Sequence, residues 1–520
     1  MLPSAAVTAS WSRRRFLQAS VGAVAGAFAV GVAADEIFLG RVGARGASAT
    51  ASPTPTGPAK SIPPVARALY RSRGDLAPQV MTVSTPAIGT APGFLFTTPS
   101  YNFKSDGPAI YDDRGSPVWV HPLTGTTTAE GFRVASFGGT PVLTWWEGTV
   151  SAQGLGAGQY VIADDTYREI GRFGAADGVA GDLHEFLITP QGTALIIAGR
   201  EVQLASPVTV AASGSVAPTI VTTAWEGIVQ EIDIATQKVL FEWHSMDHVD
   251  PAESYLPLPS TPGQAYDYLH MNSIDVDTDG NLLLSARHTF CVYKIDRTSG
   301  AVMWRLGGKK GDFTMGPGTA FAWQHDARRQ ADGTITVFDD DQAPNGSRGL
   351  VLEVDETAKA ASLIRAYTHP PSIQSTSQGN MEVLPNGDVL IGWGSQPNVT
   401  EFDQPGKVVF DAALPPGGSS YRAFRFPWVA RPTEPPAIAL DLSEPGTLTA
   451  FVSWNGATEV ASWELLGGGT PATLTPLASA PRDGFETAFA IPKRPAFVAA
   501  RAHSFTGLVL GTSPVITTTL

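Results

Sequence analysis

The chain has 520 residues, which is more than one folding unit usually holds, so we expect more than one domain. Hydrophobic residues make up 43% and charged residues 16%, a composition typical of a globular chain rather than a disordered one. The formal net charge of -13 argues against a nucleic-acid-binding surface. The single cysteine, Cys291, excludes an intramolecular disulfide and multi-cysteine zinc, iron–sulfur or covalent haem sites.

The N-terminal segment is typical of an export signal. Arg13–Arg15, followed by Phe16 and Leu17, precede an apolar run that extends to about Ala34. Paired arginines before a moderately hydrophobic segment indicate the twin-arginine route, and a general secretory signal or a short membrane anchor is the alternative. We therefore expect the twin-arginine translocation machinery as a partner. The mature protein is expected in the periplasm, on the cell surface or in the medium, with no stable membrane span after processing.

Composition and pattern divide the chain into four regions. Residues 1–49 form the twin-arginine signal region, and residues 50–85 form a linker rich in Ala, Ser, Thr and Pro. Residues 86–430 consist of repeated hairpins with alternating apolar residues. After two prolines, residues 435–520 hold about seven short alternating strands, which fits an immunoglobulin- or fibronectin-like β-sandwich.

The repeated unit is about 50 residues long and contains an inner and an outer hairpin. The clearest outer hairpins are residues 227–243, 291–306, 349–367 and 399–410. The inner hairpins that precede outer ones are residues 132–145, 184–199, 270–287, 325–339 and 380–393. Four strands per unit predict an all-β fold, a six-bladed β-propeller followed by the C-terminal sandwich. The count of six requires a returning strand near residues 421–428 to complete the first unit, and a long sandwich or solenoid is the alternative.

Three histidines and one asparagine open inner hairpins at similar positions. These residues are His184, His270, His325 and Asn380, and the turn glycines Gly192, Gly280, Gly333 and Gly387 follow them by 8, 10, 8 and 7 residues. The innermost strand of each propeller blade lines the central channel. The register therefore predicts that the four side chains face one another at one end of the channel. Arg287 closes the hairpin that His270 opens, and register alone does not place it.

These residue types suit more than one chemistry. No histidine accompanies a Gly-x-Ser-x-Gly sequence, so acyl transfer lacks its nucleophile. A three-histidine metal site is one option. Transfer of a sulfuryl or phosphoryl group is another, because a neutral imidazole can attack, a guanidinium can stabilise oxygens, and a second imidazole can move the proton. The acidic run Asp339–Asp341 is interpreted as an exposed turn.

The motifs around these residues resemble the arylsulfotransferase family, in its actinobacterial and fungal-type branch. They are Leu183-His184-Glu185-Phe186, His270-Met271-Asn272-Ser273, Leu284-Ser285-Ala286-Arg287-His288, Trp304-Arg305-Leu306-Gly307-Gly308, Trp323-Gln324-His325-Asp326-Ala327-Arg328, Gly379-Asn380 and Gly392-Trp393-Gly394. The resemblance covers roughly residues 92–427. It implies a six-bladed propeller that moves a sulfuryl group from a small phenolic sulfate ester to a phenolic acceptor. It also implies no cofactor, no metal and no nucleotide sulfate donor.

The resemblance also implies roles for single residues. His325 would be the nucleophile, sulfated transiently in a ping-pong cycle, with His184 and His270 as acid/base or charge-stabilising partners. Arg287 would hold the sulfate oxygens. The predicted substrate-binding residues are Asn380, Asn272 and His288.

Two other classes of function remain open at this point. One is another exported propeller enzyme, such as a quinone-dependent dehydrogenase or a metal-dependent lactonase. The absence of vicinal cysteines and of a complete acidic calcium set counts against it. The other is a non-catalytic binding protein at the cell surface. The histidines in register count against that one.

Overall fold

The computed structural model describes residues 66–101, 104–210, 219–259, 263–341 and 346–518. The twin-arginine region and the first part of the linker lie outside these ranges, so both assignments stay predictions. Within the described residues the elements are β-strands and two 3₁₀ turns, η1 (Ser245–Asp247) and η2 (Pro251–Glu253). The expected all-β class is confirmed. No helix in the described ranges has the length and apolar character needed to cross a membrane.

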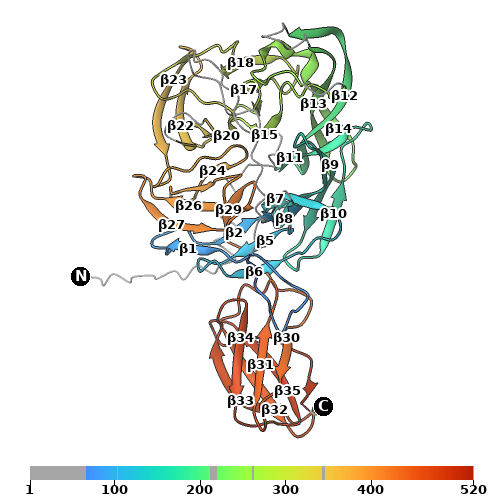
Figure 1. Cartoon of the computed structure of the whole chain (residues 1–520), viewed down its shortest axis with the longest axis vertical. Helices are drawn as coiled ribbons and strands as arrows, with labels where there is room; N and C mark the ends of the chain where they lie inside the picture. Colours follow the sequence, from blue (N-terminus) through green and yellow to red (C-terminus); the bar gives the residue numbers. More distant parts are fainter. Residues whose placement is uncertain (1–65, 102–103, 211–218, 260–262, 342–345, 519–520) are drawn as a thin grey trace, which may run out of the picture.

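The large lobe contains sheets of eight, five, five, four, four and three strands. We divide the eight-stranded sheet into two halves and set the short strands aside, which gives six groups of four antiparallel strands (Figure 1). The first three groups are β29 (Ala423–Phe426) with β2 (Phe94–Thr97), β5 (Ala109–Tyr111) and β6 (Pro117–Val120); β7 (Thr128–Phe137), β8 (Thr140–Val150), β9 (Gly156–Ala163) and β10 (Glu169–Phe173); and β11 (Ala180–Ile188), β12 (Thr193–Val210), β13 (Thr219–Asp233) and β14 (Val239–His244). The last three are β15 (Met271–Val276), β16 (Leu282–Ala286), β17 (Cys291–Ile295) and β18 (Val302–Gly307); β20 (His325–Arg329), β21 (Ile335–Asp339), β22 (Arg348–Asp355) and β23 (Ala360–Tyr367); and β24 (Asn380–Val383), β25 (Val389–Gly392), β26 (Asn398–Phe402) and β27 (Val408–Ala413).

Short strands extend these groups. They are β1 (Thr82–Thr85) beside β27, β19 (Thr314–Met315) parallel to β23, and the small sheet of β3 (Ser100–Tyr101), β4 (Lys104–Ser105) and β28 (Gly418–Ser419). One backbone pairing, Gly181 with Gly158, also joins the second and third groups.

The predicted hairpins are confirmed as antiparallel pairs. Their turns use backbone of positive φ, as at Gly280 with 86° and Gly333 with 89°, which glycine adopts without steric cost. The predicted returning strand is β29, which pairs with β2 in a register that joins Arg425 to Leu95. The end of the large lobe is therefore hydrogen-bonded to its beginning.

The core of the large lobe is divided among six clusters of buried apolar side chains. Five of these clusters lie between groups that follow one another, and one of them includes Leu195 of β12 and Tyr293 of β17. The sixth cluster joins the last group to the first and includes Leu95 and Leu390. The groups therefore pack in cyclic order, and in Figure 1 they surround a common centre.

The C-terminal lobe contains two further sheets (Figure 1). One has β30 (Ala437–Asp441), β31 (Leu448–Ser453) and β34 (Glu486–Ile491), and the other has β33 (Thr475–Pro481), β32 (Ser462–Gly468), β35 (Phe497–His503), β36 (Val509–Thr512) and β37 (Ile516–Thr517). Their inner faces share a core around Trp463. Hydrogen bonds attach this lobe to the outer edge of β6, because the side chain of Asn455 bonds both the N–H and the carbonyl of Val120 and the Gly456 N–H bonds the Val118 carbonyl.

Candidate active site

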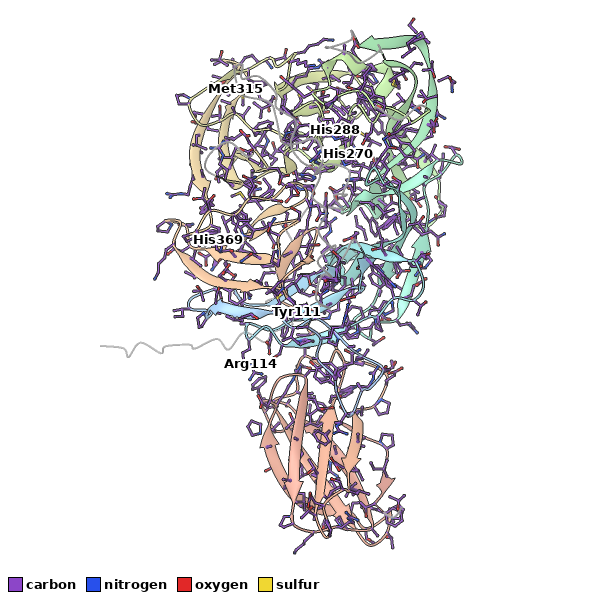
Figure 2. The ribbon with its side chains drawn as sticks, in the orientation of Figure 1. Tyr111, Arg114, His270, His288, Met315 and His369 are labelled. Atoms are coloured by element: carbon purple, nitrogen blue, oxygen red, sulfur yellow. The ribbon has the colours of Figure 1, made fainter. Side chains whose placement is uncertain are left out.

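The three predicted histidines lie at the inner strands of three consecutive groups. His184 is within β11, His270 immediately precedes β15, and His325 is the first residue of β20. All three are buried, with relative exposures of 1%, 8% and 2%. Figure 2 shows His270 near the middle of the large lobe, with His288 beside it.

Irregular strand pairing accompanies each of these histidines. The register shifts between Gly181 and Phe186 around His184, between Met271 and Ser273 next to His270, and between His325 and Arg328. Such β-bulges bend a strand and re-aim its side chains.

Left-handed backbone is concentrated at the same place. His270, Phe290, Trp323, Asp326 and Gln378 have φ between 49° and 72°. Residues other than glycine rarely adopt this conformation, which costs on the order of 1–3 kcal/mol and tends to occur at functional sites. Strain in the chain thus coincides with the histidines.

His184 and His270 form a direct pair. Their Nε2 atoms are 3.1 Å apart, and the rings meet edge to face with centroids 4.7 Å apart. Each Nδ1 has a carboxylate partner: Asp182 for His184, and Asp267 for His270 at 2.5 Å. Asp182 also accepts hydrogen bonds from the backbone N–H groups of Gly156 and His184.

The hydrogen-bond partners of the two rings leave one proton for the two Nε2 atoms to share. A carboxylate only accepts, so each Nδ1 carries a hydrogen, and two bare Nε2 atoms would repel at this distance. Burial lowers the pKa of His184, although Asp182 opposes the shift. Burial works against ionisation of Asp267, but the neighbouring His270, which also donates a hydrogen bond to it, prevails and lowers its pKa to about 2. The shared proton therefore lies between the two Nε2 atoms, with the ionised Asp267 on the His270 side.

His325 has its two ring nitrogens fixed by different partners. Its Nδ1 lies 2.7 Å from Oδ2 of Asp340, and its Nε2 accepts the backbone N–H of Gln378 at 3.3 Å. Because a backbone N–H only donates, Nε2 is unprotonated and Nδ1 carries the hydrogen. Burial, together with the charges of Arg287 and Arg422, holds the pKa of His325 well below its usual value. The ring is therefore neutral, with its lone pair on Nε2.

Arg287 is held beside the histidines by several contacts. Its Nη1 donates to Nε2 of His288 at 3.1 Å, and its Nη2 donates to the carbonyl of Thr376 at 2.9 Å. The guanidinium carbon lies 4.8 Å from the ring of Trp323. His288 in turn donates from Nδ1 to the backbone carbonyl of Asp267, so it is neutral and accepts from Arg287.

A buried ionic network supports the strand that bears His325. Asp326 accepts from Arg328 at 2.6 Å and from Arg422 at 2.5 Å, and Arg328 also bonds Glu185 at 2.7 Å. Glu185 follows His184 in β11, and Asp326 follows His325 in β20. The network thus ties together the strands that carry two of the histidines.

The two predicted asparagines differ in their surroundings. The Asn380 side chain donates to the carbonyl of Ala423 at 2.8 Å and accepts its N–H at 2.9 Å, so it clamps β24 to β29. Asn272 donates to the carbonyl of Gln324, next to His325, and its Oδ1 is buried without a hydrogen-bond partner. The structure therefore brings Asn272 to the histidines and gives Asn380 a backbone clamp instead.

The carboxylates behind the histidines are functional candidates that the sequence motifs did not supply. Asp182 and Asp267 lie close in sequence to their histidines, and that short spacing is a usable signal. Asp340 belongs to the run expected as an exposed turn, and this expectation is wrong. Asp339 and Asp340 are fully buried. Arg348 bonds the carboxylate of Asp339, and His325 bonds the carboxylate of Asp340.

One group among the described residues could hold a metal ion. Ligand atoms of Asp267, His270 and His288 lie within 4.8 Å of one another. It differs from the three-histidine set that the sequence allows. In the structure these atoms hydrogen-bond one another or the backbone, with the His270 Nδ1 on Asp267 and the His288 Nδ1 on a carbonyl.

A family model described as arylsulfotransferase (ASST) matches residues 133–414, which include His184, His270 and His325. Among curated proteins no match is found. Solved structures give distant similarities. A protein of unknown function from Bacteroides caccae has 16% identity over 64% of this chain and 98% of its own, with a TM-score of 0.39. A periplasmic gluconolactonase from Pseudomonas aeruginosa has 14% identity over 64% and 99%, with a TM-score of 0.35.

A catalytically inactive virginiamycin B lyase from Staphylococcus aureus, solved with quinupristin, has 9% identity over 72% of this chain and 97% of its own, with a TM-score of 0.33. At these TM-scores the structural similarities carry no argument about fold or activity.

Proposed function

Because the chain belongs to the arylsulfotransferase family, we propose that it moves a sulfuryl group from a phenolic sulfate ester to a phenolic acceptor, in a ping-pong cycle through a sulfated His325. The reaction uses neither a nucleotide sulfate donor nor a metal. The single observation that supports this best is the state of His325. Its ring is neutral, its lone pair is on Nε2, and Arg287 and a proton-bearing histidine pair lie nearby.

In the first half-reaction the lone pair of His325 Nε2 forms a bond to sulfur, and the bond between sulfur and the phenolic oxygen breaks. The leaving oxygen takes the proton that His270 and His184 share, so a neutral phenol departs. The Nδ1 hydrogen stays on the bond to Asp340, which keeps the ring in the tautomer whose Nε2 can attack.

In the second half-reaction an acceptor phenol gives its proton back to the His184–His270 pair. Its oxygen attacks sulfur, the sulfur–nitrogen bond breaks, and the electron pair returns to His325 Nε2. The enzyme regains its starting protonation state, so the cycle balances.

Arg287 stabilises the sulfate oxygens in both half-reactions, because a guanidinium donates in the plane that these oxygens occupy. His288 acts by keeping Arg287 in place. We assign Asn272 to substrate positioning because it lies beside Gln324 and His325. For Asn380, the backbone clamp favours a structural role.

The architecture proposed for this enzyme is a six-bladed β-propeller at residues 86–430 with an immunoglobulin- or fibronectin-like sandwich at residues 435–520. Six four-stranded groups, cyclic packing of their cores and the pairing of β29 with β2 support the propeller. Two packed sheets around Trp463 support the sandwich.

We also propose export by the twin-arginine route, from Arg13–Arg15 and the apolar run after them. The substrates would then be small phenolic compounds met in the periplasm, at the cell surface or in the medium.

The test is to incubate metal-stripped protein with an aryl sulfate ester, with and without a phenol. Phenol release and the intact mass of the protein are measured. We expect a sulfuryl adduct that is absent in His325→Ala, and faster turnover when acceptor is present. No turnover with any aryl sulfate would overturn the proposal. Strict dependence on an added metal or quinone would favour a lactonase or dehydrogenase, and ligand binding without turnover would favour a surface-binding protein.

A further inference from the structure

A continuous row of aromatic rings leads from Arg287 towards solvent. The Phe290 ring meets Trp323 edge to face with centroids 4.7 Å apart, and on its other side it stacks on Tyr255 at 4.1 Å and 4°. Arg287 lies over Trp323 at the inner end. Lys309 lies over Tyr255 at the outer end, with 4.8 Å from its Nζ to the ring centroid. We call Tyr255, Phe290 and Trp323 the aromatic strip.

The strip is accessible and firmly held. Tyr255 is 41% exposed, and Phe290 and Trp323 are half-buried. The Tyr255 N–H donates to the His288 carbonyl, and the Phe290 N–H donates to the Arg287 carbonyl. Phe290 and Trp323 both have positive φ, near 51° and 55°. Partly exposed aromatic side chains, two of them on strained backbone, beside the proposed reacting groups are better explained by ligand binding than by core packing.

The charges at the two ends of the strip indicate which kind of ligand it would bind. Arg287 provides a cation at the inner end, next to the histidines. The Nζ of Lys309 donates to the backbone carbonyls of Ala252 and Ser254, and within the described ranges no carboxylate pairs with it. The adjacent Lys310, in contrast, is neutralised by Glu253 at 3.0 Å. The strip is thus an aromatic surface with an uncompensated positive charge at its outer end.

We propose that the aromatic strip binds the ring system of the phenolic substrate, and that Lys309 favours extended, fused-ring phenols that carry a second anionic group at the end far from the reacting oxygen. This inference rests on the proposed sulfuryl transfer. It adds the substrate class: planar aromatic anions longer than a single phenol, with donor and acceptor using the same strip in turn. Stacking on an aromatic side chain contributes about 0.5–1.5 kcal/mol, which corresponds to roughly a threefold to tenfold change in affinity.

The test measures direct binding by titration calorimetry, with phenol, a naphthol and a hydroxynaphthoate as probes. We expect wild-type protein to bind the hydroxynaphthoate more tightly than the naphthol, and both more tightly than phenol. Phe290→Leu should weaken both naphthalene probes about threefold to tenfold. Lys309→Gln should weaken the binding of the hydroxynaphthoate alone, about twofold to threefold. The protein would then no longer prefer the probe that carries a second charge.

Two matched variants control for apolar surface and charge. Phe505→Leu removes a 73% exposed aromatic ring from the C-terminal lobe, and Lys310→Gln removes the neighbouring, neutralised lysine. Both should bind like wild type. Equal affinities for the three probes in wild type, or equal effects of Lys309→Gln and Lys310→Gln, would overturn the inference.

Turnover separates the two proposals. Phe290→Leu and Lys309→Gln should raise the KM for naphthyl substrates. They should leave kcat near its wild-type value, because neither side chain contacts His325. If no variant and no wild-type preparation forms the sulfuryl adduct, the sulfotransferase proposal fails while the binding result still decides the role of the strip.

Discussion

The Nε2 atoms of His184 and His270 lie 3.1 Å apart, and each ring presents its Nδ1 to a buried aspartate. This contact is stable only while the pair holds a single proton between the two rings. In the proposed reaction the general acid would therefore be present before substrate arrives, as a proton between two imidazoles.

Asp267→Asn is expected to shift the pH dependence of the donor half-reaction. The variant removes the negative charge that stabilises the shared proton, so the pKa of the pair falls. The pair must be protonated to release phenol, so the alkaline limb of kcat/KM moves to lower pH. Initial rates of phenol release across pH measure this shift.

A histidine–aspartate pair outside the site provides the control. Asp411 bonds His369 at 3.1 Å, away from the site. Asp411→Asn should leave the alkaline limb where it is in wild type. An unchanged limb in Asp267→Asn, or an equal shift in both variants, would contradict the shared proton.

Asp340→Ala is expected to lower kcat by about 10²- to 10⁴-fold with little change in the fold. The lost carboxylate fixes the Nδ1 hydrogen of His325, and a histidine freed from such a partner spends time in the tautomer whose Nε2 cannot attack. Stopped-flow rates of sulfuryl-adduct formation measure the effect, and nitrogen NMR of labelled histidine reports the tautomer. Asp339→Ala removes the neighbouring buried carboxylate, which bonds Arg348, and should retain the tautomer of His325.

Asn380→Ala is expected to affect stability rather than substrate binding. The change leaves the N–H and the carbonyl of Ala423 without their buried partner and costs about 1–3 kcal/mol of unfolding free energy. Denaturant unfolding followed by tryptophan fluorescence measures the loss. Asn386→Ala, on the exposed turn of the same hairpin, should change the free energy by less than about 0.5 kcal/mol. A large rise in KM with normal stability would instead support the predicted substrate-binding role of Asn380.

Glu130 makes the stability of the large lobe dependent on pH. Burial raises its pKa from 4.5 to about 8, although a hydrogen bond from Thr98 opposes the shift. The folded-state pKa lies above the unfolded value, so the contribution of the protonated group is complete below about pH 4.5. It is lost as pH rises through about 8.

Glu130→Gln, which imitates the protonated side chain, should therefore be close to wild type at the acidic end of this window. At its alkaline end the variant should be more stable than wild type by on the order of 2–5 kcal/mol. Unfolding at the two pH values measures the difference. Glu353→Gln, on an outer strand, should show no such pH-dependent gain. A Glu130→Gln variant that is less stable than wild type at both values would refute the assignment.

The strands could be predicted from sequence because alternation and turn glycines are local signals. His184, His270 and His325 were predicted to converge. The structure brings the first two into contact, and burial, Arg287, Arg422 and this histidine pair lower the pKa of the third. Asp340 could not be assigned to His325 in advance, because it lies 15 residues away, just after the paired strand β21, and no spacing rule links them.

Asn380 shows why the register of the hairpins alone did not predict where its side chain lies. The histidine-bearing strands contain bulges that re-aim their side chains, whereas β24 pairs with β25 in continuous register from Asn380 onwards. An Asn in the same nominal position therefore reaches sideways to β29. Bulges depend on contacts between strands, so periodicity in one strand did not reveal them. The sequence did not predict the aromatic strip either, because Tyr255, Phe290 and Trp323 come from three separate loops.

The pairing of β29 with β2 also governs when the molecule can fold. Arg425 reaches the backbone of Gly93 across 332 residues of chain, so the first sheet stays incomplete until almost the whole large lobe has been synthesised. Contacts of such long range close late, because the loop entropy is lost before the contact is gained. A ribosome-bound chain that ends before Ala423 would expose β2 as an unpaired edge. Folding of the large lobe is therefore expected to follow synthesis as one late, slow event, and truncations near this strand should yield aggregated protein rather than a smaller active enzyme.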